Sequence, residues 1–295
     1  DQAAKQAAER AAAEQAAKQA AEKAAAEKEA AAKAASVLEA KVTAEPKLFS
    51  PDGDGNDDTM RFILSVESGS GIVEWKLDLI ERAVSESTKS GTGQERVFMS
   101  WEGKGAPPSE IQWNGVSAKK ELVQSATDYP FKLTVKDKLG QTKTSSGVLS
   151  VDVLVLKDGN NLVLKVPSIV FRSDNADFKS LSADIVANNE EVIARIAQIL
   201  NKFPEYNIKI QGHANSASKI AGLSQAKIQA EETKELIPLS LNRAKMVMSM
   251  LIQNGVDKAR LTAEGLGSSK PVVSFSDAQN RWKNRRVEFI LIKKK

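Results

Sequence analysis

Hydrophobic and polar residues change their spacing twice along the chain, and each change marks a boundary between kinds of structure. Residues 1–36 contain only alanine, glutamine, charged residues and one serine, which predicts one long solvated helix without an apolar stripe. Residues 42–158 instead alternate apolar and polar side chains over short runs separated by glycine, serine and proline clusters. Strands are expected around 62–66, 73–79, 131–135 and 151–155. This pattern predicts an antiparallel β-sandwich.

The remaining residues combine the helical and the strand periods. Val192, Ile196 and Leu200 recur at helical spacing, so an amphipathic helix is expected over about 183–203. Ser240 is expected to cap a second helix that ends at Asn254. Strands are expected within 162–171, 206–213, 260–267 and 285–292. The order β-α-β-α-β-β predicts an α+β domain with its helices on one face of the sheet.

These changes divide the chain into three parts. We expect an alanine-rich helical spacer over 1–41, an all-β sandwich over 42–158 and the α+β domain over 159–295. No run of apolar residues is long enough to predict a membrane-spanning helix.

The amino-acid composition excludes several kinds of functional site. The 295 residues include no cysteine and one histidine, His213, which excludes disulfides, thiolate metal sites and sites with several histidines. The net charge is +4, and residues 163–295 carry 21 basic against 13 acidic residues. This excess favours a partner that bears carboxylates or other anions. Nucleic acid is not expected, because aromatic residues make up 5% and no nucleic-acid-binding motif is present.

Three segments of the middle part carry a family resemblance. They are FSPDGDGNDD (49–58), IQWNG (111–115) and DYPFKLTVKDKLGQ (128–141). In this order they resemble the first strand, a central strand and the last hairpin of the FlgD-type immunoglobulin-like domain. The resemblance implies a structural or docking module of the bacterial envelope.

The first of these segments also contains alternating oxygen-bearing side chains, namely Asp52, Asp54, Asn56 and Asp58. This spacing can present oxygens to a calcium ion. However, the glycine of calcium-binding loops is replaced by Asp57, and their bidentate glutamate by Ile63. Calcium binding and a solvated turn both remain open, and no other cofactor is expected.

Four segments of the C-terminal part resemble the OmpA/MotB C-terminal domain family. They are IVFRSDNADF (169–178), IKIQGHAN (208–215), LSLNRAKMVMSMLIQNGVDKARLTAEGLGSSKP (239–271) and NRWKNRRVEF (280–289). The resemblance implies a non-catalytic module that associates with peptidoglycan in the periplasm, near the outer membrane. It also implies that an aspartate binds the ammonium of the stem-peptide diamino acid and that an arginine binds its carboxylate.

Only part of this binding site is kept. Arg243 stands at the family arginine, and Arg281 and Arg285 lie in the closing motif. Asn215 replaces the family aspartate, and Leu236 replaces an asparagine.

The sequence departs from the family at two further places. Arg172 stands where the first strand usually has an aspartate, although Asp174 follows closely. An insertion near 216–238, within KIAGLSQAKIQAEETKE (219–235), separates the two halves of the site.

These departures predict weak or lost binding of the usual diamino acid. Two alternatives remain: a peptidoglycan anchor with altered ligand preference, and a scaffold that binds proteins through the N-terminal helix and the insertion. An enzyme that hydrolyses glycan with paired carboxylates has no motif to support it.

Overall fold

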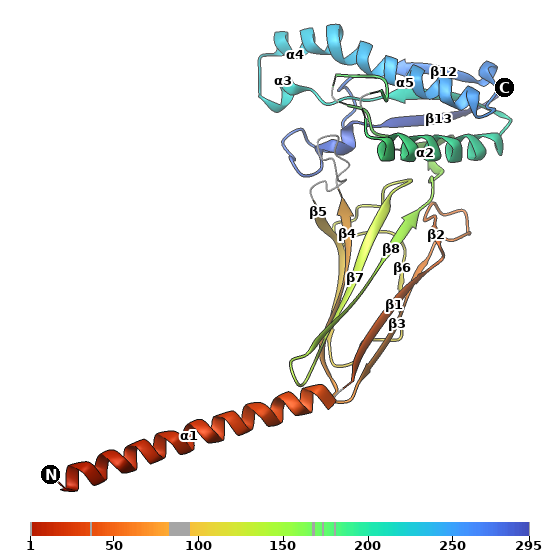
Figure 1. Ribbon diagram of the computed structural model, residues 1–295. Coiled ribbons are helices and arrows are strands. Elements are labelled where there is room, and N and C mark those ends of the chain that lie inside the picture. The colour runs from red at the N-terminus through yellow and green to blue at the C-terminus, as the bar shows by residue number, and fades with distance from the viewer. Residues whose placement is uncertain are drawn as a thin grey trace.

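The computed structural model describes residues 2–35, 37–82, 95–166, 169–172, 174–179 and 181–294. A long helix, a domain of two β-sheets and an α+β domain follow one another along the chain (Figure 1).

Helix α1 (Gln2–Ala35) projects away from the rest of the molecule (Figure 1). Its described side chains are exposed, as expected for a helix without an apolar stripe. Strand β1 (Leu38–Glu45) begins soon after, so residues 38–41 belong to a sheet and not to the helical spacer. The physical reason is that Leu38 and Val42 are 8% and 5% exposed and pack inside the two-sheet domain.

The two-sheet domain contains one sheet of three strands and one of five. The smaller has the order β1-β3-β6, with β3 (Met60–Ser68) and β6 (Glu110–Trp113). The larger has the order β2-β8-β7-β4-β5, with β2 (Leu48–Phe49), β8 (Thr142–Val151), β7 (Asp128–Asp137), β4 (Ile72–Arg82) and β5 (Glu95–Lys104). The two sheets share one core, in which Phe62, Leu77 and Leu133 are fully buried.

The strand expected over 151–155 is wrong in part. Strand β8 ends at Val151, and Val153 lies beyond it without strand pairing. Val153 is 3% exposed because it packs into the core of the α+β domain. Its apolar character therefore serves the contact between domains and not the sheet.

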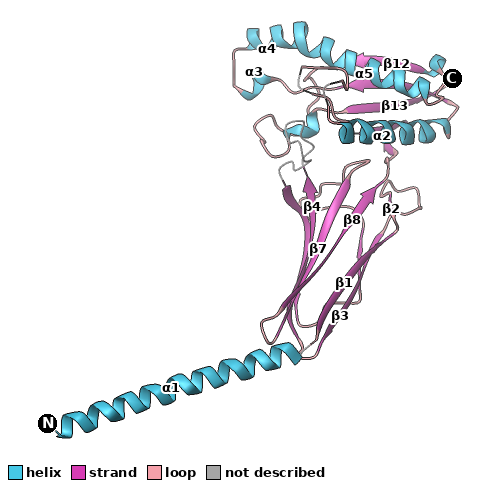
Figure 2. Cartoon of the chain, in the orientation of Figure 1, coloured by secondary structure: helices cyan, strands magenta, loops and turns pink. Residues whose placement is uncertain are grey.

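The α+β domain is built on a five-stranded sheet of order β12-β11-β13-β10-β9. The strands are β9 (Leu156–Asp158), β10 (Asn161–Val166), β11 (Tyr206–Gly212), β12 (Leu261–Gly265) and β13 (Val287–Lys293). Helices α2 (Ala183–Asn201) and α5 (Ile237–Gln253) pack beside each other and share a core with the sheet (Figure 2). The predicted order of these main elements is confirmed.

The insertion contributes α3 (Ala217–Ile220), α4 (Gln225–Glu231) and a π-helical turn, η1 (Glu232–Leu236), which leads directly into α5. The prediction that Ser240 caps a helix is therefore wrong. The helical turns before it already supply the backbone acceptors, and Ser240 lies buried inside α5. Its hydroxyl donates to the Ile237 carbonyl and accepts from the Gly267 backbone N–H, at 3.1 and 3.0 Å.

Two single 3₁₀ turns complete the domain. They are η2 (Lys258–Arg260) before β12 and η3 (Arg281–Asn284) before β13.

Candidate functional site

The candidate site lies where β11 and β12 end, and two glycines let helix α5 approach these strand ends closely. Gly212 and Gly265 face each other in the parallel register of β11 and β12. A Cβ on Gly212 would overlap with the Ser240 carbonyl, and one on Gly265 would overlap with that of Ile237. Only glycine leaves room for the helix backbone here. The contact fixes the start of α5 above the residues that follow β11.

Asn215 follows β11, and its two side-chain ends differ in their surroundings. Its Nδ2 donates to the Arg281 carbonyl of turn η3, at 2.8 Å. Its Oδ1 is buried and has no hydrogen-bond partner among the described residues. An asparagine oxygen accepts hydrogen bonds but carries no charge. The position where a carboxylate was expected therefore offers a neutral acceptor held by η3.

Arg243 is one turn further along α5 than Ser240 and is only 5% exposed. Its Nε donates to the Asn175 carbonyl at 2.9 Å, and its Nη2 donates to the Arg172 carbonyl at 2.8 Å. Its guanidinium also lies over the Phe171 ring, 5.3 Å from the ring centre. The cation thus holds the backbone of the segment before α2 in place.

The other predicted site residues are placed differently. Asp174 has a positive φ of 54° and an exposed side chain, and the contacts to Arg243 come from the carbonyls on either side of it. Arg281 contributes its carbonyl to Asn215, with its side chain half-buried. Arg285 is half-buried at the end of η3, where its N–H donates to the Trp282 carbonyl. The structure therefore brings Asn215 and η3 together directly, whereas Arg243 binds a different loop.

The insertion supplies a carboxylate that the sequence analysis did not single out. Glu231 accepts hydrogen bonds from the Ser216 hydroxyl at 2.6 Å and from the N–H groups of Ala217 and Ser218 at 2.8 and 3.1 Å. Burial raises the pKa of Glu231, but these hydrogen bonds outweigh it and lower the pKa overall. Glu231 therefore fixes the loop that follows Asn215.

The next residue binds the loop after β12. Glu232 accepts from the backbone N–H of Ser268 at 2.7 Å and from the hydroxyl of the same residue. Lys219 donates to the Ser268 carbonyl and hydroxyl at 3.0 and 2.8 Å. The insertion is thus attached to the loops after both β11 and β12. No local sequence motif predicted that the insertion would bind these loops, because the partner residues lie far apart along the chain.

His213, the single histidine, is buried in a charged cluster. Its Nε2 lies 3.6 Å from Glu288 Oε2, and Arg286 Nε donates to Glu288 Oε1 at 2.7 Å. Burial lowers the pKa of His213. Although burial alone would raise the pKa of Glu288, the neighbouring His213 and the charge of Arg286 lower it to about 2. This environment favours a neutral histidine beside an ionised glutamate, a structural arrangement.

The aspartates of the predicted calcium loop do converge. Oxygens of Asp52, Asp54 and Asp58 lie within 4.8 Å of one another, and Asp52 Oδ1 is buried without a hydrogen-bond partner among the described residues. Burial, together with the neighbouring charges, raises the pKa of Asp52. Asp58 already accepts from the N–H groups of Gly53 and Gly55, both at 2.7 Å. The Asn56 amide donates to Asp54 at 3.2 Å. Calcium binding stays a prediction.

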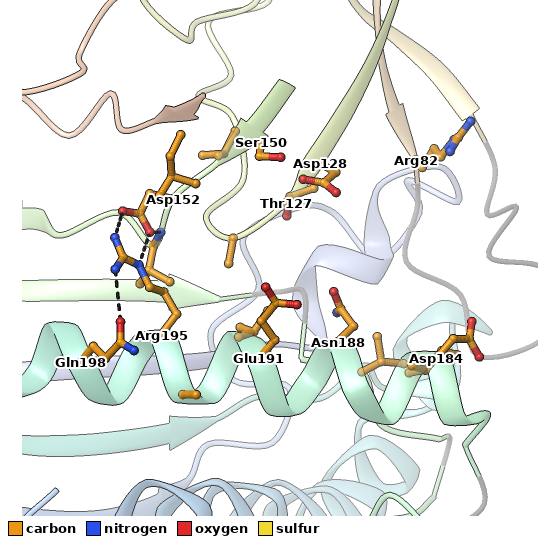
Figure 3. Close-up of a pocket in the computed structure, with 18 residues that line it drawn as sticks. Arg82, Thr127, Asp128, Ser150, Asp152, Asp184, Asn188, Glu191, Arg195 and Gln198 are labelled. Carbon is orange, nitrogen blue, oxygen red and sulfur yellow. Dashed lines mark hydrogen bonds and ion pairs between the residues drawn. The ribbon is translucent and has the colours of Figure 1, made fainter. Parts of the chain in front are cut away.

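A cleft of about 770 Å³ separates helix α2 from the end of the two-sheet domain (Figure 3). Asp128 and Glu191 face it from opposite sides, and Arg195 crosses it to Asp152. The Arg195–Asp152 pair has two contacts, of 2.6 and 3.0 Å. The cleft is therefore bridged by an ion pair between the domains.

Comparison with known proteins supports the resemblance of the C-terminal part. Residues 177–285 match the model of the OmpA family. The probable lipoprotein YiaD of Escherichia coli (strain K12) is 28% identical over 151 residues, which cover 51% of this chain and 60% of YiaD. The peptidoglycan-binding protein ArfA of Mycobacterium tuberculosis (strain ATCC 25618 / H37Rv) is 30% identical over 114 residues, which cover 39% of this chain and 31% of ArfA.

Motility protein B of Helicobacter pylori (strain J99 / ATCC 700824) is 32% identical over 127 residues, 43% of this chain and 44% of that protein. The chain therefore spans less than two thirds of each of these relatives. The crystal structure of the periplasmic domain of Helicobacter pylori MotB is 27% identical, with a TM-score of 0.38, and the match covers 48% of this chain and 79% of that one. Among the described residues, no helix combines the length and apolar character needed to cross a membrane.

Proposed function

On the premise that residues 177–285 form an OmpA-like domain, we propose that this chain is a non-catalytic protein of the bacterial periplasm that associates with peptidoglycan. The name of its relative ArfA, a peptidoglycan-binding protein, supports this ligand class. Arg243, at the position of the family arginine, supports it from the chain itself. Association with the outer membrane is part of the same proposal.

Within this function, binding of the usual diamino acid is weak. The observation that carries the proposal is Asn215, whose buried Oδ1 is a neutral acceptor where the family has a carboxylate. Hydrogen bonds to charged groups contribute roughly 1.5–3 kcal/mol and neutral ones roughly 0.5–1.5 kcal/mol. The difference corresponds to about a tenfold loss of affinity for an ammonium group.

Two further features also weaken the binding of the diamino acid. Leu236, at the position of a family asparagine, is 7% exposed and offers no side-chain hydrogen bond. Arg243 already donates to the carbonyls of Arg172 and Asn175. A ligand carboxylate must compete with these carbonyls, so the cationic half of the site is also weakened.

Co-sedimentation with purified peptidoglycan sacculi tests this function in the full chain. We expect the wild type to sediment weakly and Asn215→Asp to sediment about tenfold more tightly, because a carboxylate restores the charge-assisted bond. Arg243→Ala should remove the sedimentation that the wild type shows. Full wild-type sedimentation of Arg243→Ala would show that another surface binds the wall.

A second candidate function is a scaffold that binds proteins through the insertion. Ile220, Leu223 and Ile237 on or next to the insertion are 40–42% exposed, and exposed apolar groups of this kind occur at protein contacts. If neither the wild type nor Asn215→Asp sediments with sacculi, the scaffold is favoured.

We also propose roles for the two N-terminal parts of the chain. Residues 42–158 are a FlgD-type immunoglobulin-like module, supported by two sheets around one core and by the β7–β8 hairpin. Helix α1 (Gln2–Ala35) is the spacer, whereas residues 38–41, which were expected in the spacer, belong to strand β1 of this module. The module holds the OmpA-like domain away from the spacer helix (Figure 1).

A further inference from the structure

A buried ion pair joins the two-sheet domain to the OmpA-like domain. Lys283 Nζ, in turn η3, lies 2.9 Å from Glu81 Oε1 at the end of β4. The two side chains are 6% and 2% exposed. Arg96 of β5 binds the other oxygen of Glu81 at 2.5 Å, and the Tyr129 hydroxyl lies 3.4 Å from Oε1. Glu81 therefore receives one cation from each domain.

Turn η3, which contains Lys283, also contacts Asn215 of the candidate ligand site. The Arg281 carbonyl, two residues before Lys283, accepts the hydrogen bond from Asn215 Nδ2 at 2.8 Å. Asn284 anchors the other end of η3 by accepting from the N–H groups of Val272 and Val273 at 2.8 and 3.1 Å. A continuous series of short contacts thus runs from the two-sheet domain, through a four-residue turn, to the site.

We infer that Glu81 is a positioning residue for the ligand site of the OmpA-like domain, acting through Lys283 and the Arg281 carbonyl on the side chain of Asn215. This inference rests on the proposed function, because it assigns a role within the same site. The two-sheet domain is then part of the binding unit and not only a spacer.

The burial of the pair is the reason to expect strong coupling. An exposed ion pair contributes little, but removal of one partner from a buried pair leaves a charge without compensation. Among the ion pairs of the described residues, Lys283 is paired with Glu81 only. Lys283 Nζ also lies 5.5 Å from the centre of the Trp282 ring. Without Glu81 its buried charge has no carboxylate beside it, so we expect the lysine to turn toward solvent and to displace η3.

The molecule offers a matched control at the same interface. The Arg195–Asp152 pair also bridges the two domains, but it joins them through helix α2 across the cleft of Figure 3. Neither residue contacts η3 or Asn215 in the interactions of the described residues. Loss of this pair is expected to loosen the interface and to leave the contacts from Glu81 through Lys283 and η3 to Asn215 in place.

Nuclear magnetic resonance of the full chain tests the inference without any ligand. The side-chain amide signal of Asn215 is identified by its absence in Asn215→Asp. We expect Glu81→Gln and Lys283→Met each to shift this signal and to speed its exchange with water by up to about tenfold, the effect of losing one hydrogen bond. Asp152→Asn should leave the signal unchanged. The double variant Glu81→Gln/Lys283→Met should change the signal no more than the single variants do, since it removes the same contact and leaves no lysine charge unpaired.

Two results would overturn the inference. One is an unchanged Asn215 signal in folded Glu81→Gln and folded Lys283→Met. The other is an equal change in Asp152→Asn, which would mean general loosening of the interface. Sedimentation of the Asn215→Asp variant with sacculi is measured separately. If this variant does not sediment, the proposed function is rejected. If the Asn215 amide signal does not respond to Glu81→Gln and Lys283→Met, the positioning role is rejected.

Discussion

At position 215 stands a half-buried amide, whose Nδ2 donates to the Arg281 carbonyl and whose buried Oδ1 has no hydrogen-bond partner among the described residues. The sequence predicted that Asn215 and Arg243 belong to the ligand site, because both stand at positions of the family motif. It could not predict that Arg243 donates to the carbonyls of Arg172 and Asn175, since the path of that loop is set by tertiary packing. Nor could it predict Lys283, whose partner Glu81 lies about two hundred residues earlier.

The His213–Glu288 pair predicts a specific dependence of stability on pH. Both pKa values are lowered by folding, that of Glu288 from 4.5 to about 2 and that of His213 from 6.5. Below pH 6.5 the unfolded chain therefore binds a proton on His213 that the folded chain resists, and below pH 4.5 the same holds for Glu288. Stability should fall as the pH drops through each value.

Urea unfolding between pH 8 and pH 5 measures the histidine contribution. The free energy of unfolding should decrease by up to about 1.4 kcal/mol per pH unit below 6.5, the limit for one proton. His213→Gln should flatten this slope. An unchanged slope in that variant would show that His213 stays accessible to protons when folded.

At the scale of elements, the alternation and helical spacing predicted the main strands and helices of the α+β domain, because those patterns are local. The start of α5 was missed for a physical reason. Ser240 is a good capping residue by itself, but the insertion adds the helical turns α4 and η1 before it. The close contact of α5 with the strand ends depends on glycine, which gives a second prediction.

Gly212→Ala should destabilise the α+β domain, because its Cβ would overlap with the Ser240 backbone. Overpacking of this kind costs about 1–3 kcal/mol, and a backbone neighbour, which cannot rotate away, favours the upper end. Thermal unfolding of the full chain measures the loss. Equal stability of Gly212→Ala and the wild type would contradict this packing.

At the scale of the whole molecule, the three parts were visible in the sequence because their hydrophobic patterns differ: the first has no apolar stripe, the second alternates, and the third combines the helical and the strand periods. Their attachment was not visible, because it depends on pairs that are distant along the chain: Glu81 with Lys283, and Asp152 with Arg195. Val153 makes the same point, since it belongs by sequence to the sandwich and by packing to the other core. The domain interface is therefore the part of the structure that local patterns could not predict.

The central claim is that the wall-binding site has kept its cation and replaced its anion with an amide. Calorimetric titration of the full chain with diaminopimelate tests it most directly, with Asn215→Asp as the matched variant. We predict that the wild type binds no tighter than about 1 mM and that Asn215→Asp binds about tenfold more tightly. Micromolar binding by the wild type would contradict the claim.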